Sequence, residues 1–225
     1  MMNFEIFLLI AIGIAGFLVQ TKLQNVFKKY SKVLSPGGLT GREVAEKMLR
    51  DNGIYDVRVT CVAGQLTDHY NPATKTVNLS EGVYQSNSVA AAAVAAHECG
   101  HAVQHATGYA PLKMRSRLVP VVQISSMLSQ LVIILGIFTL HSFPALFWLG
   151  IAMFAMFLVF SLITLPVEYN ASHRALAWLE GSRTLRTMEV EQVREALTWA
   201  ARTYLVAALS ALASLIYYLG FADRD

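Results

Sequence analysis

Three of the six histidines of this 225-residue chain fall in one short stretch, AAHECGHAVQH, residues 95–105. His97 and His101 are four residues apart, so on a helix their imidazoles lie on one face and can bind the same zinc ion. Glu98 follows the first histidine, where it can take a proton from a water molecule beside that ion. Two ligands and a general base on one rigid turn form the H-E-x-x-H pattern of metallopeptidases. A polar patch on an amphipathic helix is the alternative interpretation.

Two histidines do not complete a catalytic zinc site, which uses three protein ligands and keeps one position for water. His105 is on the same predicted helix but two turns from His97, so we expect it to make a supporting polar contact. Glu168 is the stronger candidate, because a carboxylate at the end of an apolar segment needs a partner to offset desolvation. We expect Glu168 to begin a new helix after Pro166. A solvated glutamate at the membrane interface is the alternative.

The elements that carry these residues belong to a membrane protein. The chain is 55% hydrophobic and only 15% charged, whereas a soluble domain carries about 25% charged residues. Four apolar segments approach the length that crosses a bilayer, at about 4–19, 118–140, 145–165 and 204–221. Only HSFP separates the second from the third, which predicts a tight hairpin. The first segment lacks a basic start and a cleavage pattern, so we interpret it as a retained anchor.

The basic residues predict the orientation of these segments. Seventeen of the eighteen Lys and Arg residues lie in 22–117 and 174–202, and the exception is Arg224 in the acidic tail. The positive-inside rule therefore places both regions in the cytoplasm and both termini outside. We expect a multi-pass protein of the cell membrane with its active site on the cytoplasmic side. Its predicted partners are the lipid bilayer and a membrane-associated peptide or protein, not nucleic acid; the oligomeric state stays open.

The cytoplasmic regions predict a small α+β module. Thr40 and Glu43 have capping-box spacing at the start of a helix that ends near Gly53. VRVTCVAG and KTVNLS alternate like strands around the turn-rich DHYNPATK. A helix with Ser86 or Ser88 as its N-cap then carries the histidines and ends before Gly108. Cys99 on this helix points away from the histidines, which favours packing over a redox or supporting role at the site.

These elements define the predicted fold class: a mainly α membrane protein with about four transmembrane helices and a small cytoplasmic α+β, zincin-like module. The predicted divisions are a first anchor at 1–24, the cytoplasmic module at 25–116, a transmembrane hairpin at 117–166, a cytoplasmic helical segment with the third ligand at 167–203, and the last transmembrane helix and tail at 204–225.

HECGH, followed by a hairpin and then by EYNASHRA, resembles the YugP-type family of membrane-bound neutral zinc metallopeptidases. The likeness covers nearly the whole chain and includes DHYNPATKTVNLS, SVAAAAVAAHE and LPVEYNAS. The chain is more distantly similar to the HtpX and CAAX prenyl protease group, whose third ligand is a glutamate after a later span. The resemblance implies this role for Glu168. In that group an aspartate four residues later supports a zinc histidine; here the position is Ser172, whose hydroxyl brings no charge.

Several other polar residues are candidates to orient a ligand or to stabilise the charge that develops on the peptide oxygen. They are Ser172, His173, His105, His69 and Tyr70, with Arg174 and Tyr84 as further candidates for the second role. Each of them taken alone is more typical of a structural residue.

The sequence thus predicts a gluzincin-like zinc metalloendopeptidase that cleaves peptide bonds at the cytoplasmic membrane face. One Zn²⁺ per chain would be held by His97, His101 and Glu168, with Glu98 as the general base. The KTVNLS strand is predicted to offer an edge to an extended substrate. Two alternatives stay open: an intramembrane zinc protease, whose histidine helix lies within lipid, and a non-catalytic adaptor that binds zinc for structure.

Overall fold

The computed structural model describes residues 4–222, so Arg224 lies outside the described residues. The elements in chain order are α1 (Phe4–Tyr30), α2 (Gly41–Asp51), β1 (Arg58–Val62), β2 (His69–Asn71), β3 (Thr76–Ser80), α3 (Glu81–Tyr84), α4 (Val89–Ala106), α5 (Ala110–Phe138), α6 (Pro144–Gly181) and α7 (Thr187–Ala222). They form two compact units. Of the described residues, one unit contains 4–19, 113–166 and 203–222, and the other contains 20–112 and 167–202. The predicted fold class, mainly α with a small α+β part, is confirmed.

The first unit contains the apolar parts of four long helices. Among the described residues, α1, α5, α6 and α7 are long and apolar enough to cross a membrane, which confirms the four predicted spans. The predicted hairpin between α5 and α6 is also present. A Cβ added to Gly136 would lie 2.4 Å from the Cα of Phe147, and one added to Gly150 would lie 2.7 Å from the Cγ1 of Ile133. These two glycines therefore let the helices approach to backbone contact.

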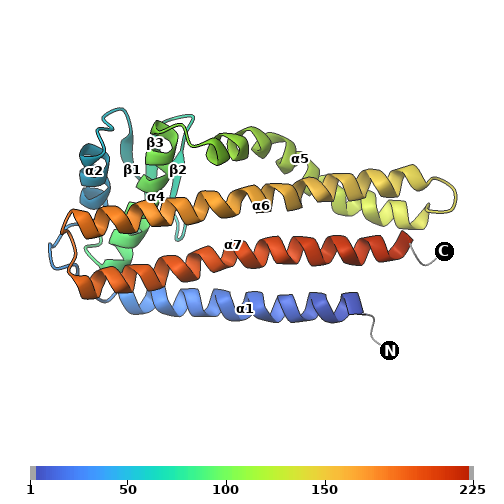
Figure 1. Cartoon of the computed structure of the whole chain (residues 1–225), viewed down its shortest axis with the longest axis horizontal. Helices are drawn as coiled ribbons and strands as arrows, with labels where there is room; N and C mark the ends of the chain where they lie inside the picture. The colour runs from blue at the N-terminus through green and yellow to red at the C-terminus, as the bar shows by residue number, and fades with distance from the viewer. Residues whose placement is uncertain (1–3, 223–225) are drawn as a thin grey trace. The chain divides into compact units, whose positions relative to one another are not determined.

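The expectation that a new helix begins after Pro166 is wrong. α6 continues without interruption from Pro144 to Gly181 and contains Pro166 (Figure 1). A proline removes one backbone hydrogen bond from a helix, and in apolar helices neighbouring groups compensate for that loss. Glu168 therefore lies within the helix that also forms the third apolar span, two residues beyond the proline.

The second unit is built on a three-stranded sheet in the order β1-β3-β2. β1 pairs with β3 in parallel, and β2 pairs with β3 antiparallel, with Tyr70 opposite Val77. The sequence predicted β1 and β3 but missed β2, because three residues inside a turn-rich segment show too little alternation. The expectation that KTVNLS forms a free edge is also wrong. Both sides of β3 are paired, so the edges of the sheet are β1 and β2.

Helix α4 lies beside this sheet and forms the centre of the unit (Figure 1). The Ser88 side chain caps it by accepting a hydrogen bond from the N–H of Ala91, and Gly108 follows its end at a φ of +68°. Most of its alanines are fully buried, so small side chains let α2 and the sheet pack closely around it. Cys99 is buried on this side and its thiol lies 3.6 Å from the Ala45 carbonyl, which matches the packing interpretation.

Candidate metal centre

One turn of α4 carries His97, Glu98 and His101, with both histidines on the side of the helix that meets α6 and Glu98 in contact with β2. The two helices touch at Gly100, where an added Cβ would lie only 2.5 Å from the carbonyl oxygen of Ala171. A larger residue at position 100 would hold α6 further away. The glycine inside HECGH therefore allows the close crossing that brings Glu168 to the two histidines.

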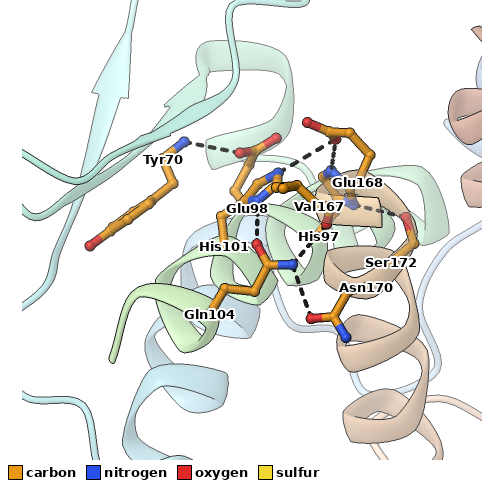
Figure 2. Close-up of polar contacts among 9 residues, drawn as sticks. All are labelled: Tyr70, His97, Glu98, His101, Gln104, Val167, Glu168, Asn170 and Ser172. Carbon is orange, nitrogen blue, oxygen red and sulfur yellow. Dashed lines mark hydrogen bonds and ion pairs between the residues drawn. The ribbon is translucent and has the colours of Figure 1, made fainter. Parts of the chain in front are cut away.

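Three donor atoms meet at this crossing (Figure 2). The ligand atoms of His97, His101 and Glu168 all lie within 4.8 Å of one another. Glu168 Oε2 is 3.2 Å from His97 Nε2 and 3.5 Å from His101 Nε2. Ligands at about 2.0 to 2.2 Å in a tetrahedral shell stand roughly 3.3 to 3.6 Å apart. The two separations from Glu168 are close to this range, and two imidazoles with a carboxylate are a donor set that suits a zinc ion.

The site is buried and strongly polar. Glu168 is 1% exposed and His101 is 6% exposed. Burial by itself would lower the pKa of His101, but the hydrogen bond and negative charge of Glu168 outweigh it, and the pKa is raised. A buried carboxylate therefore attracts positive charge to the Nε2 side of the histidines, where a bound cation would sit.

Each histidine is also held at its other ring nitrogen. His97 Nδ1 lies 3.1 Å from the Ser172 hydroxyl, and His101 Nδ1 lies 3.0 Å from Gln104 Oε1. Gln104 is fully buried and donates to the Val167 carbonyl and to the Asn170 side chain. Gln104 and Asn170 were not among the residues predicted from the sequence. The signal that could have found Gln104 is its i, i+3 spacing from His101, which puts both on one helix face.

A hydrogen bond from the backbone of the sheet holds the Glu98 carboxylate in place. Its Oε2 accepts a 2.9 Å hydrogen bond from the backbone N–H of Tyr70, the middle residue of β2. The phenol of Tyr70 turns away from Glu98 (Figure 2) and lies 2.7 Å from His105 Nδ1, and burial raises its pKa to about 12. His105 thus makes the polar contact expected for it. Tyr70 contacts Glu98 through its backbone, not through its side chain.

The remaining candidates are not brought to the three donor atoms. His69 contacts the Thr67 carbonyl and the Asn78 side chain, on an exposed part of β2. His173 is exposed on α6, although it follows Ser172 directly. Arg174 donates from Nε to Asn170, and Tyr84 lies under the guanidinium of Arg42.

The comparison with known proteins decides the family. Residues 5–223 match the family model described as "Putative neutral zinc metallopeptidase". The chain belongs to this family. It is 44% identical over 214 residues to "Putative membrane protease YugP" of Bacillus subtilis (strain 168), covering 95% of this chain and 94% of the relative. No solved structure matches the chain. The match confirms the resemblance found in the sequence, and with the four apolar helices it makes the chain a membrane protein of a zinc peptidase family.

Proposed function

We propose that this zinc metallopeptidase homologue is an endopeptidase that works at the cytoplasmic face of the cell membrane. In this proposal His97, His101 and Glu168 hold one zinc ion per chain. The observation that carries it is the convergence of three donor atoms from α4 and α6, which are far apart in the sequence, at separations that suit one tetrahedral ion.

Zinc in this position would polarise a water molecule and the carbonyl of the scissile peptide bond. Glu98 acts as the general base. The Tyr70 N–H holds one carboxylate oxygen and leaves the other for proton transfer. Glu98 takes a proton as the water oxygen bonds to the carbonyl carbon. When the C–N bond breaks, Glu98 gives that proton to the leaving nitrogen, so the products are a carboxylic acid and an amine.

The outer edge of β2 is the proposed binding surface for the substrate backbone. Because the Tyr70 N–H points to Glu98, the backbone polar groups of Tyr70 face away from β3, and its carbonyl lies on the same open edge. Since Glu98 already accepts from the Tyr70 N–H, an extended peptide would donate to the Tyr70 carbonyl at this edge and would pass by Glu98. This mode of binding favours unfolded or flexible segments of membrane and peripheral proteins.

The proposed location rests on charge and on packing. The concentration of Lys and Arg in 22–117 and 174–202 supports a cytoplasmic site. α4 is not among the four apolar helices found in residues 4–222, and its buried face is covered by α2 and the sheet. This packing supports an interfacial site over one surrounded by lipid.

The Glu98→Gln variant tests the mechanism. It should retain one equivalent of zinc, because Glu98 is not one of the three donors, and should lose roughly 10²- to 10⁴-fold in cleavage rate. Zinc content by atomic absorption and cleavage of a quenched fluorescent casein peptide, both on the detergent-purified chain, give the two values. Glu180→Gln is the control, since Glu180 is exposed and pairs with Arg194. Parent-like cleavage by Glu98→Gln would exclude the mechanism.

A further inference from the structure

A chain of hydrogen bonds runs from the surface of α6 to one of the histidines. Arg174 Nε lies 2.8 Å from Asn170 Oδ1, and the same oxygen is 3.0 Å from Gln104 Nε2. Gln104 Nε2 is also 2.7 Å from the Val167 carbonyl, and Gln104 Oε1 is 3.0 Å from His101 Nδ1. Figure 2 shows Gln104 between His101 on one side and Val167 and Asn170 on the other.

The direction of each bond follows from what each group can do. A guanidinium only donates, so the Asn170 atom that faces Arg174 is the amide oxygen. That oxygen and the Val167 carbonyl both accept, and together they take the two hydrogens of the Gln104 amide nitrogen. The Gln104 oxygen must then face His101. Because an amide oxygen only accepts, His101 Nδ1 carries a hydrogen.

This assignment decides which nitrogen of His101 is available to a metal. In a neutral imidazole with its hydrogen on Nδ1, the lone pair is on Nε2, and this is the atom that lies 3.5 Å from Glu168. The opposite tautomer would place a hydrogen where the metal must bind. The hydrogen bond at the Nδ1 atom of His97 does not fix the tautomer of that residue in the same way. Its Nδ1 meets the Ser172 hydroxyl, which can either donate or accept.

We propose that Gln104, Asn170 and Arg174 are positioning residues that hold His101 in its Nδ1–H tautomer, so that Nε2 is always the ligand atom. The inference rests on the proposed zinc site. Gln104 is fully buried in this network, so a rotation of its amide would set its nitrogen against the imidazole N–H and its oxygen against two acceptors. In this proposal Arg174, which the sequence offers as a candidate oxyanion donor, acts through Asn170.

The test is the zinc dissociation constant of the full chain in detergent, measured by competition with a chromophoric chelator. Gln104→Met keeps the side-chain size and removes every polar atom, and should weaken binding about 10- to 100-fold. Asn170→Leu should weaken binding in the same direction. Asn170→Asp keeps an acceptor oxygen for Gln104 and Arg174. If this oxygen orients Gln104, the zinc dissociation constant of this variant should be within about threefold of the parent value. Gln65→Met, at an exposed position, is the control.

Two further measurements separate positioning from simple loss of fold. Thermal unfolding of the zinc-free variants reports on stability, and the visible spectrum of the cobalt-substituted protein reports on the ligands. Weakened binding by Asn170→Leu, restored by Asn170→Asp at equal zinc-free stability, supports the proposal. Parent-like zinc binding by Gln104→Met, or equally weak binding by both Asn170 variants, overturns it. A parent chain that binds no zinc would instead overturn the proposed function itself.

Discussion

Glu168 is the residue on which the proposed site depends most. Its carboxylate is almost completely buried and lies 3.2 Å from Nε2 of His97 and 3.5 Å from Nε2 of His101. Burying a carboxylate costs free energy, and a bound cation offsets that cost. The burial of Glu168 beside two imidazoles therefore supports the proposed cation site.

Removing this carboxylate should almost abolish zinc binding. Glu168→Ala leaves two imidazoles, so the loss of affinity should exceed the 10- to 100-fold typical of residues that only orient a ligand. Ser172→Ala, which removes a contact to His97 but no donor atom, should show the smaller effect. Zinc stoichiometry after dialysis against graded chelator concentrations measures both. If Glu168→Ala retains zinc while Glu180→Ala or Glu195→Ala loses it, the third ligand is another glutamate.

The residues of the site differed in how far the sequence could predict them. His97, Glu98 and His101 could be placed because helix geometry converts their spacing directly into a shared face. Glu168 required the resemblance to a known family and the cost of a carboxylate at the end of a span. Asn170 could not be found, because its contact with Gln104 joins two helices that are distant in the sequence. Gln104 was overlooked despite its i, i+3 spacing from His101, because a glutamine on a helix surface is ordinarily solvated.

At the scale of elements, the crossing of α4 and α6 determines whether the donors meet. Gly100 permits this crossing, and its substitution tests it. Gly100→Ala forces a methyl group to within 2.5 Å of the Ala171 carbonyl oxygen, so the helices must separate. Overpacking of this kind costs about 1 to 3 kcal/mol. We expect zinc affinity to fall at least 10-fold, as when a ligand loses its orientation.

Gly136→Ala provides the matched control. It creates a similar clash, 2.4 Å from the Cα of Phe147, but within the α5–α6 hairpin. Both variants should unfold at a lower temperature, and only Gly100→Ala should lose zinc affinity. Equal zinc affinity in both variants would show that the crossing distance at Gly100 does not determine the site.

The elements themselves were partly predictable. The capping box of Thr40 and Glu43 and the end of α2 before Gly53 were found because these signals are local. β2 and the central place of β3 were missed, because strand order depends on contacts distant in the sequence. The predicted break at Pro166 failed for a similar reason, since the surroundings of a helix decide whether it tolerates a proline.

At the scale of the whole molecule, the membrane orientation can be tested directly. In a Cys61→Ser background, a cysteine at position 142 should react with an impermeant maleimide in intact cells, and one at position 73 should react only after permeabilisation. Ser142 and Ala73 are both exposed, so accessibility alone does not separate them. Cys99 can stay, because it is buried and burial raises the pKa of its thiol. Labelling of position 73 from outside would reverse the orientation.

The separation of Glu168 from the histidines has a consequence for biosynthesis. The carboxylate follows His97 by 71 residues, with the α5–α6 hairpin in between. Since chains grow from the N-terminus at about 5 to 20 residues per second, roughly 4 to 14 seconds pass before the third donor is made. During that interval the nascent chain carries the HECGH motif with two of its three proposed ligands. If zinc binding requires all three proposed ligands, a newly made chain cannot act as a peptidase beside the ribosome and the insertion machinery until its hairpin has been synthesised.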